Sequence, residues 1–169
     1  MKKYLCFILS VLLFVPSAFS DDQISPIGHF SAWMAFKGVK DNKKVCFMAA
    51  TPMHSSKQKS DKDDDTYLMV ARYPDTPHTN EIVVMLGTTY HKTSKPTIGV
   101  DNNKVVEMFT DKDKAWIEKR AVEKDLINKM ISGNVVRTIG KSHKGTVLKD
   151  TYSLKGFTKA LNAITEECP

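Results

Sequence analysis

The chain has 169 residues, with 25 basic and 19 acidic side chains that give a net charge of +6. This length suits one ordinary domain with a real hydrophobic core and leaves no room for a second domain of similar size. The mild excess of lysine falls short of the concentrated basic face that nucleic-acid binding requires, so nucleic acid is excluded as a partner.

Residues 1–20 are predicted to be a secretory signal peptide. Lys2 and Lys3 precede an apolar run over residues 4–15, and small residues after Pro16 lead to a cleavage site after Ser20. An uncleaved anchor helix is the alternative, but the run is shorter than the roughly 20 apolar residues that span a bilayer. Cleavage leaves one domain, residues 21–169, with 23 basic and 19 acidic residues and a charge of +4, because Lys2 and Lys3 are lost.

Two cysteines, Cys46 and Cys168, remain after cleavage, because Cys6 leaves with the signal peptide. A cysteine pair in an exported domain is most simply one disulfide. A metal site is the alternative, but neither Cys-x-x-Cys nor His-x-x-x-His spacing supplies the further ligands. We therefore predict a disulfide between them and no metal or cofactor.

Short strands dominate the predicted secondary structure. Residues 21–28 are expected to form a loose arm and residues 53–65 a polar surface loop, whereas Asp101, Asn102 and Asn103 favour a tight hairpin. About nine strands are predicted, over residues 29–37, 45–50, 66–73, 81–87, 97–100, 104–109, 114–118, 134–139 and 146–151.

Two amphipathic helices complete the pattern. The first spans residues 121–131 and ends at Gly133 as its C-cap, and the second starts after Ser153 as its N-cap. Together with the strands they predict an antiparallel β-sandwich with a middle and a C-terminal helix. The apolar stripes are Val122, Leu126, Ile127, Met130 and Ile131 on the first helix, and Phe157, Leu161, Ile164 and Cys168 on the second.

No catalytic or metal site is predicted. The run of Asp61, Asp63 and Asp65 begins like a calcium loop, but Thr66 and Arg72 stand where that loop needs glycine and glutamate. No Gly-x-Ser-x-Gly elbow is present. Five histidines are expected to be surface or structural residues, because none lies at a metal-ligand spacing from another: His29, His54, His78, His91 and His143.

Two further groups could form binding surfaces, although each has a simpler interpretation. Strand aromatics in a small domain are more often core, and a run of basic residues is more often a solvated face. The aromatic group is Trp33, Phe36, Tyr67, Tyr73, Phe109 and Trp116, and the basic group is Lys112, Lys114, Lys119, Arg120 and Lys124.

Several motifs together resemble the invasion-associated locus B family of exported bacterial proteins. The resemblance covers essentially all of residues 21–169 and implies an immunoglobulin-like β-sandwich, a periplasmic or outer-envelope location and an association with host-cell invasion. It brings no catalytic residues to this chain. The motifs are Trp33 with Phe36, Val45 to Phe47 leading to Thr51 and Pro52, residues 108–111 with Ala115 and Trp116, Met130 with Gly133, and Gly145 with residues 150–157.

Two functions follow as hypotheses. The first is a non-enzymatic, disulfide-locked envelope protein, acting as a binding or structural module whose partner is a component of the envelope or of a host surface. The second is an enzyme or inhibitor acting on envelope components through loop histidines, with His91 and His143 as participants. The second requires those side chains to converge in one pocket.

Overall fold

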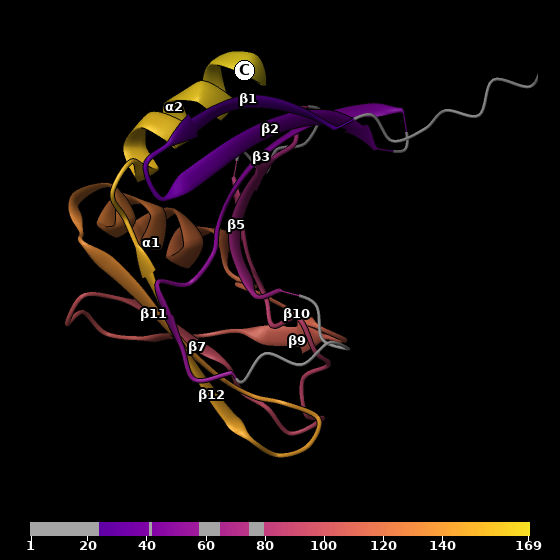
Figure 1. Ribbon diagram of the computed structural model, residues 1–169, viewed down its shortest axis with the longest axis vertical. Coiled ribbons are helices and arrows are strands. Elements are labelled where there is room, and N and C mark those ends of the chain that lie inside the picture. The colour runs from indigo at the N-terminus through magenta and orange to yellow at the C-terminus, as the bar shows by residue number, and fades with distance from the viewer. Residues whose placement is uncertain (1–23, 41, 58–64, 75–79) are drawn as a thin grey trace, which may run out of the picture.

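The structure is a computed structural model that describes residues 24–40, 42–57, 65–74 and 80–169 (Figure 1). The predicted signal peptide, Asp61, Asp63 and His78 fall outside these residues. Two antiparallel sheets pack against each other, and two helices cover the same side of the larger sheet. None of the described helices is long and apolar enough to cross a bilayer.

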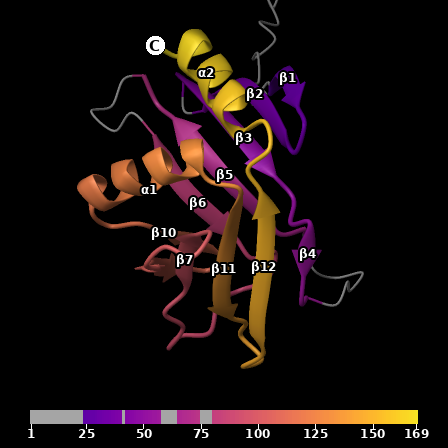
Figure 2. The ribbon, with the colours of Figure 1, turned by 90° about the vertical axis from the view of Figure 1, so that its left-hand side faces the viewer.

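The two sheets confirm the predicted β-sandwich. The larger has the strand order β1-β2-β3-β5-β6-β10-β9, and the smaller has the order β4-β12-β11-β7-β8 (Figure 2). The larger sheet contains β1 (Ser25–Phe30), β2 (Trp33–Lys40), β3 (Lys43–Ala50), β5 (Tyr67–Arg72), β6 (Glu81–Met85), β9 (Phe109–Asp111) and β10 (Lys114–Trp116). The smaller contains β4 (His54–Ser55), β7 (Thr97–Val100), β8 (Val106–Glu107), β11 (Val135–Lys141) and β12 (Val147–Ser153).

Four predicted segments differ from the structure. Residues 29–37 are not one strand, because the chain reverses after Phe30 with Ser31 at a φ of 58°. Residues 25–28 of the expected loose arm belong to the edge strand β1. The expected loop over residues 53–65 contains β4, and the strand predicted over residues 104–109 is divided at Met108, which turns into the core. The hairpin at Asp101 is confirmed, with a φ of 49° at that residue and β8 paired to β7.

The middle helix, α1 (Arg120–Ser132), lies close to its predicted bounds and ends at Gly133 as predicted. Leu126, Ile127 and Met130 are buried, whereas Ile131 at the end of the predicted stripe is 44% exposed. The backbone of Gly133 is extended, so positive φ is not the reason for a glycine there. A Cβ would lie 2.4 Å from Cγ1 of Val100, so close packing against β7 requires glycine.

The C-terminal helix, α2 (Phe157–Glu167), has the predicted stripe, and all four stripe residues are buried. Ser153 is not its N-cap, because Ser153 ends β12 and Gly156 occupies the cap position with a φ of 90°. A Cβ on Gly156 would lie 1.9 Å from the carbonyl oxygen of Phe30. The start of α2 is therefore fixed by contact with the β1–β2 turn, which local sequence does not reveal.

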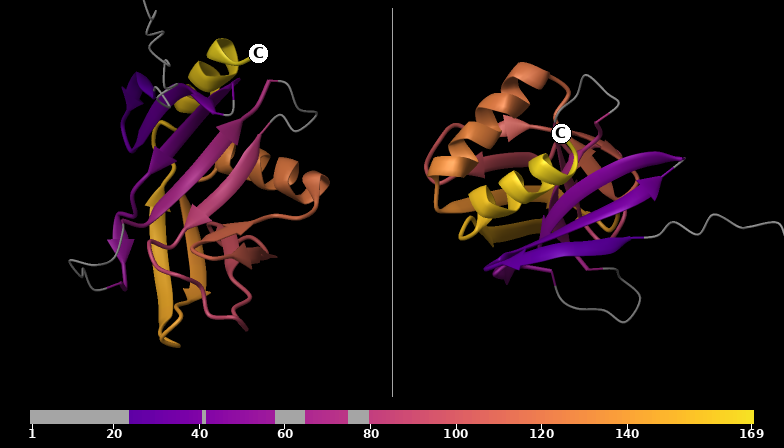
Figure 3. Two further views of the ribbon diagram at one scale, coloured as in Figure 1. Left: turned by 90° about the vertical axis from the view of Figure 1, so that its right-hand side faces the viewer. Right: turned by 90° about the horizontal axis from the view of Figure 1, so that it is seen from above.

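A disulfide joins the two ends of the domain. Cys46 on β3 and Cys168 after α2 are bonded, with Cα atoms 6.0 Å apart and both residues fully buried. The ring of Phe157 meets that of Trp33 edge-on at 5.1 Å, and the Trp33 indole N–H donates to the carbonyl of Ser153 over 2.9 Å. These contacts hold α2 on one face of β1, β2 and β3 (Figure 3, right).

Replacing Cys168 with alanine is expected to lower the free energy of unfolding by about 4–5 kcal/mol at most, because the bond closes a loop of 122 positions. Urea denaturation of oxidised wild type and variant measures the difference. Peptide mapping without reductant is expected to recover Cys46 and Cys168 in one cross-linked species. Two free thiols in protein purified without reductant, or equal stabilities of wild type and variant, would contradict the prediction.

Gly156→Ala is expected to destabilise the fold by at least about 1–3 kcal/mol, because alanine has strain at positive φ and its Cβ meets the Phe30 carbonyl. Gly145→Ala is the matched control, since Gly145 has a φ of 86° but its Cβ would meet only the end of Lys141 at 3.7 Å. The difference in thermal or urea stability between the two variants isolates the close contact. Equal losses would show that the contact has no energetic role.

Candidate functional site

The open face of the larger sheet is concave and apolar. Side chains alternate along a strand, so Phe47 and Met69 point away from the core into which Cys46, Met48 and Leu68 are packed. Sheet curvature brings the outer strands forward on this side, and no described element lies over it (Figure 1; Figure 3, left). The sheet is thus apolar on both faces but covered on only one.

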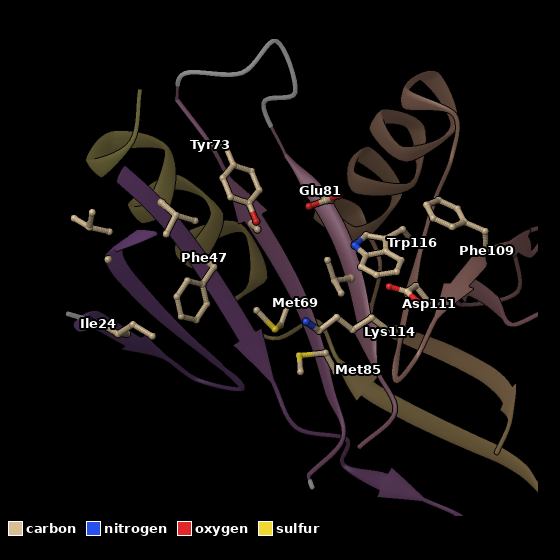
Figure 4. Close-up of a pocket in the computed structure, with 15 residues that line it drawn as sticks. Ile24, Phe47, Met69, Tyr73, Glu81, Met85, Phe109, Asp111, Lys114 and Trp116 are labelled. Atoms are coloured by element: carbon tan, nitrogen blue, oxygen red, sulfur yellow. The ribbon is translucent and has the colours of Figure 1, made fainter. Parts of the chain in front are cut away.

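A cavity of about 660 Å³ occupies this face, and we call it the concave hollow (Figure 4). Its size lies within the range of about 300–1,000 Å³ that is usual for small-molecule sites. It is lined by Ile24, Gly38, Val39, Val45, Phe47, Met69, Ala71, Tyr73, Glu81, Val83, Met85, Phe109, Asp111, Lys114 and Trp116.

Aromatic rings form the side walls of the concave hollow. Phe109 and Trp116 stack with ring centroids 5.5 Å apart, and Phe47 stacks on Phe36 at 5.1 Å. Phe109 is 51% exposed even though it is a large apolar side chain. The expectation that the strand aromatics belong to the core was therefore wrong for the residues that line this surface, Tyr73, Phe109 and Trp116, and right for Trp33.

Four polar side chains interrupt the apolar lining. Lys114 of β10 is paired in register with Asp111 of β9 and Met85 of β6, and its side chain extends over β6 toward Met69 (Figure 4). Lys114 forms no ion pair with any other residue in the described ranges. Burial, and secondly the charge of Glu81, raise the pKa of Tyr73, so the phenol stays protonated near neutral pH.

A buried glutamate beneath this surface was missed in the sequence. Glu123 of α1 is 6% exposed, and its Oε1 accepts the backbone N–H of Ile82 over 2.7 Å, next to Glu81 in the lining. Burial is the main cause that raises its pKa; the Ile82 hydrogen bond lowers it in part, and the charge of Glu81 raises it further. Glu123, Ile127 and Met130 are spaced by four and three, so the helical period could have placed Glu123 on the buried side.

Asp150 is a second buried acid, but it belongs to the sandwich interior and not to the concave hollow. Its carboxylate accepts a hydrogen bond from the hydroxyl of Ser55, which fastens β4 to β12. Burial is the main cause that raises the pKa of Asp150, and the Ser55 hydrogen bond and the charge of Lys57 oppose the rise. Each of these contacts holds strands together, so we assign Asp150 a structural role.

His91 and His143 lie on neighbouring loops, linked by a bridge between Tyr90 and Ser142, but neither lines the concave hollow. Nδ1 of His91 lies 3.0 Å from the hydroxyl of Thr93, and Nδ1 of His143 lies 3.1 Å from that of Thr88. Their contacts in the described ranges thus involve threonine hydroxyls and no carboxylate. Neither histidine therefore contributes a side chain to the concave hollow.

The predicted basic group is divided by the fold. Lys114 enters the concave hollow, whereas Lys112 belongs to the β9–β10 turn with a φ of 53°. Lys119 is the N-cap of α1, and Arg120 is the first residue of that helix. Lys124 is exposed on α1. Only Lys114 therefore faces a candidate binding site.

The fold and site define the class as a disulfide-closed, two-sheet β-sandwich with a concave apolar surface. The family model described as "Invasion associated locus B (IalB) protein" matches residues 34–165, and the chain belongs to that family. The match confirms the resemblance in the sequence and includes every residue of the concave hollow except Ile24. No curated protein and no solved structure matches the chain.

Glu123→Gln is expected to flatten the dependence of stability on pH. Because the folded pKa of Glu123 is raised above 4.5, the native state binds more protons than the unfolded state between that value and the folded pKa. The wild type therefore loses unfolding free energy as pH rises through this window, whereas glutamine contributes no such loss. Its amide oxygen can still accept from Ile82.

Urea titrations at a series of pH values measure this slope. Glu118→Gln is the control, since it removes the same charge from an exposed acid just before α1. If the unfolding free energy of Glu123→Gln depends on pH as steeply as that of wild type, Glu123 is not the origin of the pH dependence.

Proposed function

We propose that this protein is an exported, disulfide-locked and non-enzymatic module of the cell envelope that binds an apolar ligand in the concave hollow and thereby contributes to host-cell invasion. Family membership supports the invasion-associated envelope setting. The predicted cleavage after Ser20 supports export to a periplasmic or outer-envelope location, where the bond between Cys46 and Cys168 is stable.

The concave hollow is the observation that carries the proposal. Soluble domains rarely leave a large contiguous apolar surface uncovered unless it binds something. Here the apolar surface is also indented, large enough for a small molecule, and bordered by a few polar side chains that could orient a ligand. These are the properties of a binding site.

The composition of the lining supports binding over turnover. It holds no histidine, cysteine, serine or threonine, so a hydroxyl or thiol nucleophile with an adjacent histidine base is missing from the described lining. The loop histidines bond to threonines elsewhere. No specific observation favours an enzyme or inhibitor, and we therefore propose a single function.

The disulfide supports the site mechanically. Cys46 and Phe47 are consecutive residues of β3 that point to opposite faces, so the bond that holds α2 also fixes the strand that carries one wall of the concave hollow. A wall held in this way loses little conformational entropy when a ligand binds.

A neutral hydrophobic fluorophore, N-phenylnaphthylamine, tests the proposal on the exported protein. Wild type is expected to bind it saturably, and Met69→Glu to weaken binding by about tenfold or more, because a charge in the apolar floor must be desolvated. The control is Val147→Glu on β12, which adds the same charge at a side chain that is 53% exposed and outside the concave hollow.

Absence of saturable binding, or equal affinities for Met69→Glu and wild type, would overturn the binding site. The non-enzymatic part has its own test with purified envelope components as substrates. Turnover that disappears in His91→Ala or His143→Ala would overturn it.

A further inference from the structure

We infer that the ligand of the concave hollow is a free long-chain fatty acid, with its acyl chain on the apolar floor and its carboxylate on the ammonium of Lys114. This inference rests on the proposed function. It goes beyond that function in naming the ligand class and the residue that selects it.

The shortage of backbone partners favours an acyl chain over an extended peptide. The floor is formed by the side chains of β3, β5 and β6, interior strands whose backbone groups are already paired with neighbouring strands. A peptide lying there would bury N–H and C=O groups without partners, at a cost of about 1–3 kcal/mol each. An acyl chain has no such groups.

The floor is also adaptable. Met69 and Met85 lie side by side along it, between the walls formed by Phe47 and Trp116 (Figure 4). Methionine has three rotatable bonds and a polarizable sulfur, so it follows the contour of a flexible chain better than branched residues do. Such a floor suits acyl chains that differ in length or bending.

Lys114 supplies the charge complementarity. Its ammonium is directed over the floor toward Met69, and Lys114 is the one cationic residue of the described lining. A carboxylate bound there gains a charge-assisted hydrogen bond in a partly desolvated site. A neutral lipid or an amine would leave the ammonium without that partner.

Two acidic residues, Glu81 and Asp111, also line the concave hollow and affect where a carboxylate can bind. Glu81 lies at the end of the concave hollow near Tyr73, away from the Lys114 ammonium (Figure 4). Asp111 is exposed and stands across from Lys114 on β9, so its charge opposes an incoming carboxylate. Removing the Asp111 charge is therefore expected to strengthen binding of the acid.

Displacement of N-phenylnaphthylamine from the exported protein at neutral pH tests the inference, with palmitate and hexadecanol as competitors of equal chain length. Wild type is expected to bind palmitate about tenfold more tightly than hexadecanol. Lys114→Met is expected to remove that preference, because palmitate loses its cationic partner, and Asp111→Asn is expected to increase the preference for palmitate. Lys124→Met, which removes an exposed lysine of α1, is the control and should retain the wild-type preference.

The outcomes separate the inference from the proposed function. If the fluorophore binds but palmitate and hexadecanol compete equally, or Lys114→Met keeps the preference for palmitate, the assignment of a fatty acid is wrong. The proposal of an apolar binding site then still stands. Stronger competition from vesicles of an anionic phospholipid than from palmitate would also overturn the free acid in favour of a lipid surface. If the fluorophore does not bind at all, the proposed function itself fails.

Discussion

The packing of α2 on the first three strands is the constraint on which the rest of the structure depends. The smaller sheet and α1 cover the lower half of the larger sheet, whereas its upper half is covered by α2 (Figure 1). Trp33 and Cys46 are fully buried on the covered face. Burial of one large apolar side chain contributes about 1.5–3 kcal/mol, so without α2 the upper half would lose both its core and its covalent closure.

The same arrangement determines what is left open. Each interior strand of the larger sheet carries apolar side chains on both faces, as a strand between two layers would, but the described elements form a second layer on one side only. The open face of the larger sheet therefore exposes apolar side chains to water. A ligand in the concave hollow would complete the layering that α2 and the smaller sheet provide on the other side.

The parts of the fold that could be predicted from the sequence are those that local periodicity determines, above all the buried faces of the helices. The buried stripe of α2 and the end of α1 at Gly133 were predicted correctly, because spacing alone defines a helical face. The N-cap of α2 was predicted wrongly. Glycine is needed at position 156 because a side chain there would collide with the carbonyl of Phe30, a residue far away in the sequence. The turn at Ser31 was missed because its neighbours include neither glycine nor proline, the usual turn signals.

The site was less predictable than the fold for a physical reason. Apolar residues on both faces of β3, β5 and β6 indicate central strands, but they do not say which face other elements will cover. The direction of Lys114 depends on the register of β10 against β6 and β9, which arises only when distant segments pair. In sequence, Lys114 belonged with the other lysines before α1, and only the fold separates it from them.

The sequence separation of the two disulfide cysteines has a consequence for the order of events in folding. Synthesis from the N-terminus produces Cys46 before Cys168, with 122 positions between them. Contacts this distant in sequence are slow to form, because a long loop must close before they yield any stabilisation. As long as α2 is not docked, Trp33 and its neighbours on β1 to β3 have no cover, so both faces of these strands are then open to water and to aggregation.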